Sequence, residues 1–131
     1  MTSVPENPSR QGKLFASARE ALDGITDGAS VLVAGFSGCG IPEKLLRGLA
    51  DTGVGDLAII CQGSWLPDAD GFGIAGLVAG GQVKKIISPL PFHPDNGGPV
   101  KDLWEKGELA LEIVPQGILA ERLRAGGAGI G

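Results

Sequence analysis

The 131-residue sequence has the length of one domain, 43% hydrophobic residues and a formal net charge of −4. A chain of this length can bury roughly two thirds of its unfolded surface, which is enough for one core. The negative charge argues against a general nucleic-acid binder, since the densest basic stretches are only residues 84–85 and 121–124. The apolar runs are too short to span a bilayer. We therefore expect neither nucleic acid nor a membrane as a partner.

The first residues, "MTSVPENPSRQGK" over 1–13, are predicted to form an N-terminal tail in front of a domain over 14–131. The tail lacks the apolar core of a signal peptide. Cys39 and Cys61, in a chain with one histidine, match neither zinc-ligand spacing nor a disulfide framework. Reduced thiols of this kind are typical of the cytoplasm, which is the expected location.

Apolar runs rich in β-forming residues begin every 26 residues along the chain. This period suits a unit of one strand, one helix and two short loops. The runs are apolar almost throughout, as expected of parallel strands that are covered on both faces. The predicted fold is therefore α/β, an open and mainly parallel sheet with helices on both faces. The predicted strands cover 31–36, 57–61, 83–88 and 109–114.

The segments between and beside these strands have the periodicity of helices. Gly53, Gly81 and Gly107 stand where C-caps are expected. Right-handed crossovers would connect the strands, and residues 89–99, with four prolines, are predicted to be a loop. The predicted helices cover 14–25, 42–53, 72–81, 100–109 and 116–127.

The loop "AGFSGCG" over 34–40 follows the first predicted strand and precedes a helix with Pro42 in its first turn. Open α/β sheets bind ligands at this end of their strands. Gly38 and Gly40 would let the chain turn and leave N–H groups near the positive helix end, where a phosphate, carboxylate or thioester oxygen could bind. The spacing G-x-x-G-x-G is not the dinucleotide fingerprint, and a P-loop lysine is missing. A tight turn that packs the helix on the strand explains the same glycines, so both interpretations stay open.

Three other side chains are candidates for chemistry. Cys39 precedes a helix start, which can activate a thiol, but no histidine or aspartate is near it in sequence. Glu43 is explained by the helix dipole, and His93 by a solvated position in the proline-rich loop. None of the three is assigned a catalytic role, and Trp65 and Trp104 are predicted to be packing residues.

Two glutamines follow predicted strands directly. Gln62 comes after the second strand in "CQGSW", and Gln116 after the last strand in "VPQG". Parallel strands would bring Gln116 to the same sheet edge as the 34–40 loop. A neutral amide there could orient a carboxylate or an amide, and capping of the final helix explains Gln116 as well.

The stretch "DGASVLVAGFSGCGIPEKLL" resembles the signature of the small subunit, called the A subunit, of the family I coenzyme A transferases of the 3-oxoacid type. Further blocks follow in the family's order, including "GFGIAGLVAGGQVKKIIS" and "KGELALEIVPQGILAERLRAGGAGIG", so the similarity spans about residues 20–131. Ala34 and Gly35 stand where the family has two glycines, and "CQGSW" replaces an Asn-rich sequence. The family's small subunit continues well past the last block, so the resemblance implies the N-terminal portion of a CoA-transferase, or NagB-like, fold.

The resemblance implies a two-part enzyme. In the family, a glutamate of the partner, the B subunit of the CoA-transferase, attacks an acyl-CoA, and an acyl-glutamyl anhydride and a glutamyl-CoA thioester follow. An acceptor carboxylate then takes the CoA. This chain has no counterpart of that glutamate, so no catalytic residue is assigned to it. Coenzyme A is a substrate here, and no permanently bound cofactor or metal is expected.

The resemblance also implies where the substrates bind. The family's glycine-rich loop near CoA maps onto Ala34, Gly35, Phe36, Ser37, Gly38, Cys39 and Gly40. Gln62 and Gln116 are assigned to the substrate pocket. The implied reaction moves CoA between an acyl-CoA such as succinyl-CoA and a 3-oxoacid such as acetoacetate or 3-oxoadipate. A non-catalytic remnant, and a module that binds a nucleotide or sugar phosphate, remain alternative interpretations.

Overall fold

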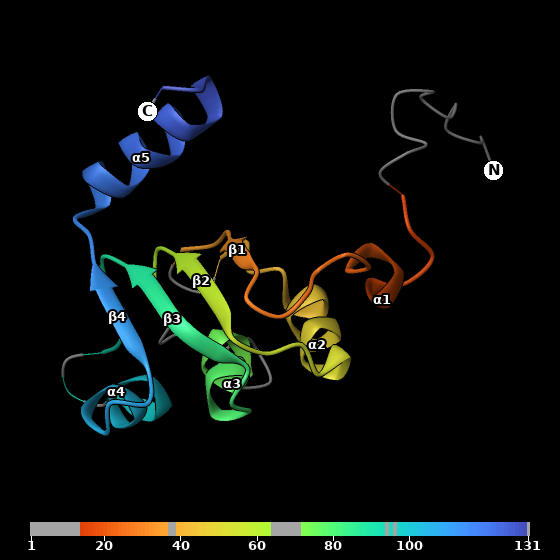
Figure 1. Ribbon diagram of the computed structural model, residues 1–131, viewed down its shortest axis with the longest axis horizontal. Helices are drawn as coiled ribbons and strands as arrows, with labels where there is room; N and C mark the ends of the chain where they lie inside the picture. Colours follow the sequence, from red (N-terminus) through yellow and green to blue (C-terminus); the bar gives the residue numbers. More distant parts are fainter. Residues whose placement is uncertain (1–13, 37–38, 64–71, 94, 96, 131) are drawn as a thin grey trace.

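The computed structural model describes residues 14–36, 39–63, 72–93, 95 and 97–130. Its strands form one sheet in the order β1-β2-β3-β4, and every neighbouring pair is parallel (Figure 1). The predicted open parallel sheet is confirmed. The strands are β1 (Ser30–Val33), β2 (Leu57–Cys61), β3 (Val83–Ser88) and β4 (Ala110–Ile113).

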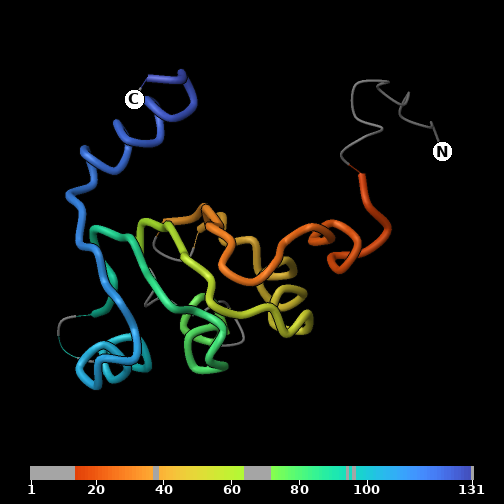
Figure 2. The backbone as a smooth tube through the Cα atoms, in the orientation of Figure 1, coloured from red at the N-terminus to blue at the C-terminus, as the bar shows by residue number. Residues whose placement is uncertain are grey.

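Helices lie on both faces of this sheet, but unequally. Because the strand order follows the chain order, right-handed crossovers place the connecting helices α2, α3 and α4 on one face. The tube in Figure 2 shows β1, β2 and β3 each followed by a helix on that side, while α5 rises from the end of β4 on the other side. The helices are α1 (Ala18–Ala21), α2 (Glu43–Thr52), α3 (Gly73–Ala79), α4 (Gly98–Glu105) and α5 (Gln116–Ala128).

The core lies between the sheet and the layer of α2, α3 and α4. Ile59 and Ile86 are register partners in the two central strands, and both are fully buried. Since side chains alternate along a strand, their neighbours in sequence point to the opposite face. The buried helical side chains that pack with these strands are Leu46, Leu49, Ile74, Leu77, Val78 and Val100.

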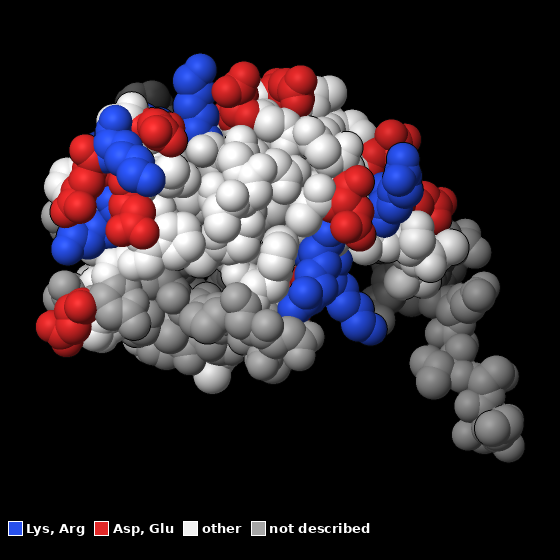
Figure 3. All heavy atoms as spheres, turned by 90° about the horizontal axis from the view of Figure 1, so that it is seen from below, with Lys and Arg blue, Asp and Glu red and all other residues white. Residues whose placement is uncertain are grey.

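The helical side of the molecule carries its charges at the flanks. Figure 3, which views the molecule from below, shows Lys, Arg, Asp and Glu along the left, upper and right edges of an uncharged middle. The uncharged sequence of α3, GIAGLVA, lies between the charged helices α2 and α4 and explains this pattern. Within the described residues, no helix is long and apolar enough to cross a membrane.

The first strand is shorter than predicted. It ends at Val33, not at residue 36, because Gly35 has a φ of 124° and turns the chain. The first helix is also shorter than the predicted 14–25, since it covers only Ala18–Ala21 and packs on α2 beside Gly48. A Cβ atom at Gly48 would lie 2.9 Å from the Cβ of Ala18. The contact between these two helices therefore depends on a glycine.

The predicted ends of α2, α3 and α5 agree with the structure within two residues, whereas α1 and α4 each end four residues before the predicted position. Gly53 is the left-handed C-cap of α2, with a φ of 72°. Gly81 and Gly107 also have positive φ values, but each lies one residue beyond its cap. Pro42 is the N-cap of α2, directly before the first helical residue.

Candidate functional site

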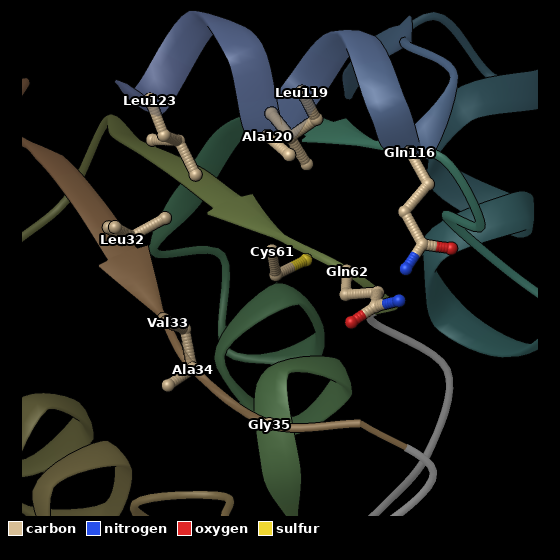
Figure 4. A pocket seen from close by; sticks show the side chains of 10 residues that line it. All are labelled: Leu32, Val33, Ala34, Gly35, Cys61, Gln62, Gln116, Leu119, Ala120 and Leu123. Atoms are coloured by element: carbon tan, nitrogen blue, oxygen red, sulfur yellow. The ribbon is translucent and has the colours of Figure 1, made fainter. Parts of the chain in front are cut away.

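A pocket of about 290 Å³ lies between β1, β2 and α5, at the carboxyl end of the sheet (Figure 4). This is the end of the strands at which open α/β sheets bind ligands. Among the described residues that line it, none is charged, and the polar side chains are two glutamines and a cysteine. The lining residues are Leu32, Val33, Ala34, Gly35, Cys61, Gln62, Gln116, Leu119, Ala120 and Leu123.

The loop after β1 is closed on itself by a pair of backbone hydrogen bonds. The N–H of Phe36 donates to the carbonyl of Cys39 at 2.9 Å, and the N–H of Cys39 donates to the carbonyl of Phe36 at 2.8 Å. These two amides are therefore already satisfied within the loop. Of the turn expected to offer N–H groups to a ligand, Cys39 thus uses its N–H within the loop, while Ser37 and Gly38 lie outside the described residues.

Gly35 is the sterically constrained glycine of this loop. A Cβ atom there would lie 2.8 Å from Cγ1 of Ile41 and 3.3 Å from the carbonyl oxygen of Cys39. Gly40 has a φ of 71°, but the position of its Cβ faces open space. A side chain at Gly40 would thus strain the backbone without filling a pocket. Gly35, which the sequence analysis assigned to CoA binding, therefore also has a packing role that the sequence did not predict.

The two glutamines assigned to the substrate pocket lie beside it. Figure 4 shows the amide ends of Gln62 and Gln116 turned toward each other at its mouth. Gln62 is half-buried at the end of β2, and Gln116 is the exposed first residue of α5. Each neutral amide can both donate and accept a hydrogen bond. Together with Ala34 and Gly35, they are the predicted site residues that the structure brings together around this pocket.

Ser88 supports the position of Gln62. Its hydroxyl is fully buried, donates to the backbone carbonyl of Gln62 at 3.1 Å and accepts from the N–H of Leu90 at 3.1 Å. Sequence reasoning missed this residue. The available signal was a polar residue at the end of a nearly apolar central strand.

The two cysteines are both free, and they differ in environment. Cys61 lines the pocket, and burial raises the pKa of its thiol to about 11. A thiol that stays protonated is a poor nucleophile. Cys39 is exposed in the loop after β1 and does not line the pocket.

The remaining candidates lie away from the pocket. Glu43 is the first residue of α2, and the Nδ1 atom of His93 accepts a local hydrogen bond from the N–H of Asp95 at 3.2 Å. Trp104 packs against Phe92 with ring centroids 5.7 Å apart, while Trp65 lies outside the described residues. A search of the described residues finds no group of three His, Cys, Asp or Glu side chains that could hold a metal ion.

The fold is that of an open parallel α/β protein with a pocket at the carboxyl end of its strands. Residues 15–131 match the family described as coenzyme A transferase. The chain belongs to this family.

The chain is similar to curated proteins from bacteria over most of its length. It is 40% identical over 119 residues to the A subunit of the 3-oxoadipate CoA-transferase of Pseudomonas putida, covering 91% of this chain and 50% of that protein. It is 44% identical over 119 residues to the A subunit of the succinyl-CoA:3-ketoacid coenzyme A transferase of Xanthomonas campestris, covering 90% of this chain and 47% of that protein. The chain thus spans about half the length of these relatives.

A solved structure shares the fold. The crystal structure of the decarboxylase AibA/AibB, in a variant with one cysteine replaced by serine, superposes with a TM-score of 0.69 at 30% identity, covering 88% of this chain and 44% of that chain. Proteins named as transferases and as a decarboxylase are therefore both similar to this chain. The fold alone does not fix the reaction, because function depends on the site.

Proposed function

We propose that this chain forms part of the A subunit of a CoA-transferase that moves CoA between an acyl-CoA, such as succinyl-CoA, and a 3-oxoacid, such as acetoacetate or 3-oxoadipate. The observation that supports this most is the pocket itself. Four residues assigned to the site from sequence, Ala34, Gly35, Gln62 and Gln116, line one cavity, in a chain that belongs to the coenzyme A transferase family.

The pocket suits an acyl group whose carbonyl or carboxylate oxygens meet the two amides. The N–H₂ groups of Gln62 and Gln116 can donate to such oxygens at the mouth. The walls behind them, formed by Leu32 and Leu119 among others, are apolar. Apolar walls exclude water and strengthen the hydrogen bonds that remain.

The nucleophile belongs to a partner in this proposal. No residue of the described pocket is a carboxylate, and the resemblance assigns the attacking glutamate to the B subunit. We place the B subunit at the mouth of the pocket, where its glutamate would meet the thioester carbon and the acceptor acid would later take the CoA. CoA is then the carried group, with no permanently bound cofactor, and the two free thiols fit the reducing cytoplasm.

The test uses a fusion of residues 1–131 to the second half of the Xanthomonas campestris A subunit, hereafter the fusion, because this chain spans about half of that relative. The fusion is co-expressed with the B subunit of the same enzyme and assayed with succinyl-CoA and acetoacetate. We expect transfer by this assembly and none by the 131-residue chain alone. No transfer by a folded assembly, or transfer by the chain alone that Glu43→Ala abolishes, would contradict the proposal.

Variants of the two amides test the role of the pocket. Gln62→Ala and Gln116→Ala should each lower kcat/KM roughly tenfold, the loss of about one hydrogen bond. Arg124→Ala is the control on α5, since Arg124 pairs with Glu121 at 2.8 Å and does not line the pocket. Cys39→Ser should also have little effect. If Arg124→Ala reduces transfer as much as Gln116→Ala, the pocket is not the substrate site.

Titration separates the remaining alternatives. The assembly should bind CoA and not a mononucleotide such as AMP. Binding of AMP without CoA would favour a nucleotide-binding module, and binding of neither by a folded assembly would favour a non-catalytic domain.

A further inference from the structure

Helix α5 forms one wall of the pocket but is held to the sheet by few contacts. Leu119 is the one buried residue of its 13, and Gln116 and Leu123, which also line the pocket, are exposed. The start of the helix is well fixed, because Val114 is buried and its N–H donates to the carbonyl of Ser88 at 3.3 Å. Surface helices normally bury a whole apolar stripe, and a single buried side chain leaves α5 able to roll about its own axis.

A cluster of ion pairs connects α5 to two strands. Arg122 of α5 donates to Oε1 of Glu112 at 2.6 Å, and Lys85 of β3 donates to Oε2 of the same carboxylate at 2.7 Å. Lys85 pairs in register with Ala110, two residues before Glu112 in β4, so both side chains project from one face of the sheet. Each oxygen of the carboxylate thus accepts a charge-assisted hydrogen bond, which is stronger than a neutral one. Lys85, Glu112 and Arg122 are called the Glu112 cluster below.

The position of Arg122 on α5 makes this cluster a rotational constraint. At 3.6 residues per turn, positions 116, 119, 120 and 123 share one face of the helix, and position 122 lies about 60° beyond position 119, at the edge of that face. Figure 4 shows the shared face turned into the pocket. A bond at the edge of a helix face resists rolling, because any roll of the helix lengthens it. The direction in which Gln116 points therefore depends on Arg122.

We propose that Glu112 and Arg122 are positioning residues for the transfer reaction, because they fix the rotation of α5 and so hold the amide of Gln116 at the mouth of the pocket. The catalytic consequence rests on the proposed function, in which this amide meets the substrate. Arg122 does not line the pocket, so it acts through Gln116. The side chains of the cluster are partly exposed, and ion pairs of this kind add little to the free energy of unfolding. Their role is to orient the helix.

Residual dipolar couplings of the 131-residue chain test the orientation without substrate. One-bond Cα–Hα couplings are measured over residues 116–124, because these bonds point away from the helix axis and report its rotation. In the native chain they should fit the alignment of the strands. In Arg122→Met and in Glu112→Gln they should shrink about twofold or more, because the helix then rolls relative to the sheet.

Arg124→Met is the matched control for these couplings, since Arg124 pairs with Glu121 of the same helix at 2.8 Å. It should leave the couplings of α5 unchanged. Native couplings in both variants of the Glu112 cluster, or an equal loss in Arg124→Met, would overturn the proposal. So would a native chain in which α5 does not share the alignment of the strands.

Transfer by the fusion together with the B subunit tests the catalytic consequence. Arg122→Met should lower kcat/KM about three- to tenfold, and Arg122→Lys should restore most of it, because a lysine keeps the charge that meets Glu112. In the Gln116→Ala background, Arg122→Met should add less than about a twofold loss, since its effect passes through the missing amide. Fully additive losses, or the same loss in Arg124→Met, would overturn the proposal.

The two experiments distinguish a failure of this proposal from a failure of the proposed function. An assembly without transfer, combined with couplings of α5 that depend on Arg122, would refute the proposed function and leave the orientation of α5 by the Glu112 cluster standing. An active assembly in which neither the couplings nor kcat/KM depend on Arg122 would refute the positioning role alone.

Discussion

The two faces of one sheet differ in what they do for the protein. On the face covered by α2, α3 and α4, the helical face, Ile59 and Ile86 are fully buried. Leu32, which points to the opposite or second face of the same sheet, is 58% exposed. The strands are mostly apolar on both faces, with Lys85 and Glu112 as charged exceptions on the second face, so their sequence alone does not reveal the difference. The face covered by α2, α3 and α4 holds the buried core, and α5 on the other side forms one wall of the pocket.

The largest expected effect comes from the helical face. Leu77 lies in α3 and is fully buried in the core. Leu77→Ala should lower the free energy of unfolding by about 2–5 kcal/mol, because it removes apolar contacts and leaves a cavity. Urea unfolding of the isolated chain measures this.

Leu32→Ala is the counterpart on the second face and should cost about 0.5 kcal/mol or less in the same chain. Equal costs for Leu77→Ala and Leu32→Ala would mean that the two faces are equally packed, and would remove the contrast between them.

The next effect concerns the turn that ends β1. Gly35→Ala should cost about 1–3 kcal/mol, because its φ of 124° is strained for any side chain and the added methyl group would contact Ile41. Gly40→Ala shares the positive φ but has open space around it, so about 1–2 kcal/mol is expected. Thermal unfolding compares the two variants.

A double substitution separates contact from backbone strain at this turn. In Gly35→Ala combined with Ile41→Ala, the contact with Cγ1 of Ile41 is gone while the φ value remains. The two changes should therefore cost less together than the sum of the single changes. Additive costs would show that the contact with Ile41 carries none of the penalty.

Sequence reasoning worked where the local pattern carries the information. The 26-residue period placed the strands, and Gly53 ended α2 as predicted, because apolar runs and left-handed caps are local signals. The packing constraint on Gly35 was not predicted, because it comes from Ile41, which lies beside Gly35 only once the chain has turned. The sequence also did not predict that helices cover one face of the sheet more completely than the other. An apolar strand has the same sequence pattern whether a helix or water covers it.

A smaller effect is expected at the support of Gln62. Ser88→Ala removes the buried hydroxyl that bonds the carbonyl of Gln62 and the N–H of Leu90. The cost should be about 1–2 kcal/mol, because both groups lose a partner in a partly buried place. Ser30→Ala, at the exposed start of β1, is the control and should cost nothing measurable. If the two serines behave alike, Ser88 does not hold the end of β2.

The smallest effect should appear at the ion pairs that hold α5 over the second face. Hydrogen bonds from Lys85 and Arg122 lower the pKa of Glu112 below its usual 4.5. A carboxylate with a lowered pKa in the folded state stabilises the fold above its ordinary pKa and loses that contribution as the pH falls through the folded value. The Tm difference between the native chain and Glu112→Gln should thus be greatest near pH 7 and shrink below about pH 4.5.

High salt should reduce this Tm difference as well, since the side chains of Lys85, Glu112 and Arg122 are partly exposed. Glu121→Gln is the control, because Glu121 pairs only with Arg124 on its own helix among the described ion pairs. A Tm difference for Glu112→Gln that stays constant from pH 7 to pH 3 would mean that the charge of Glu112 does not hold α5 in place.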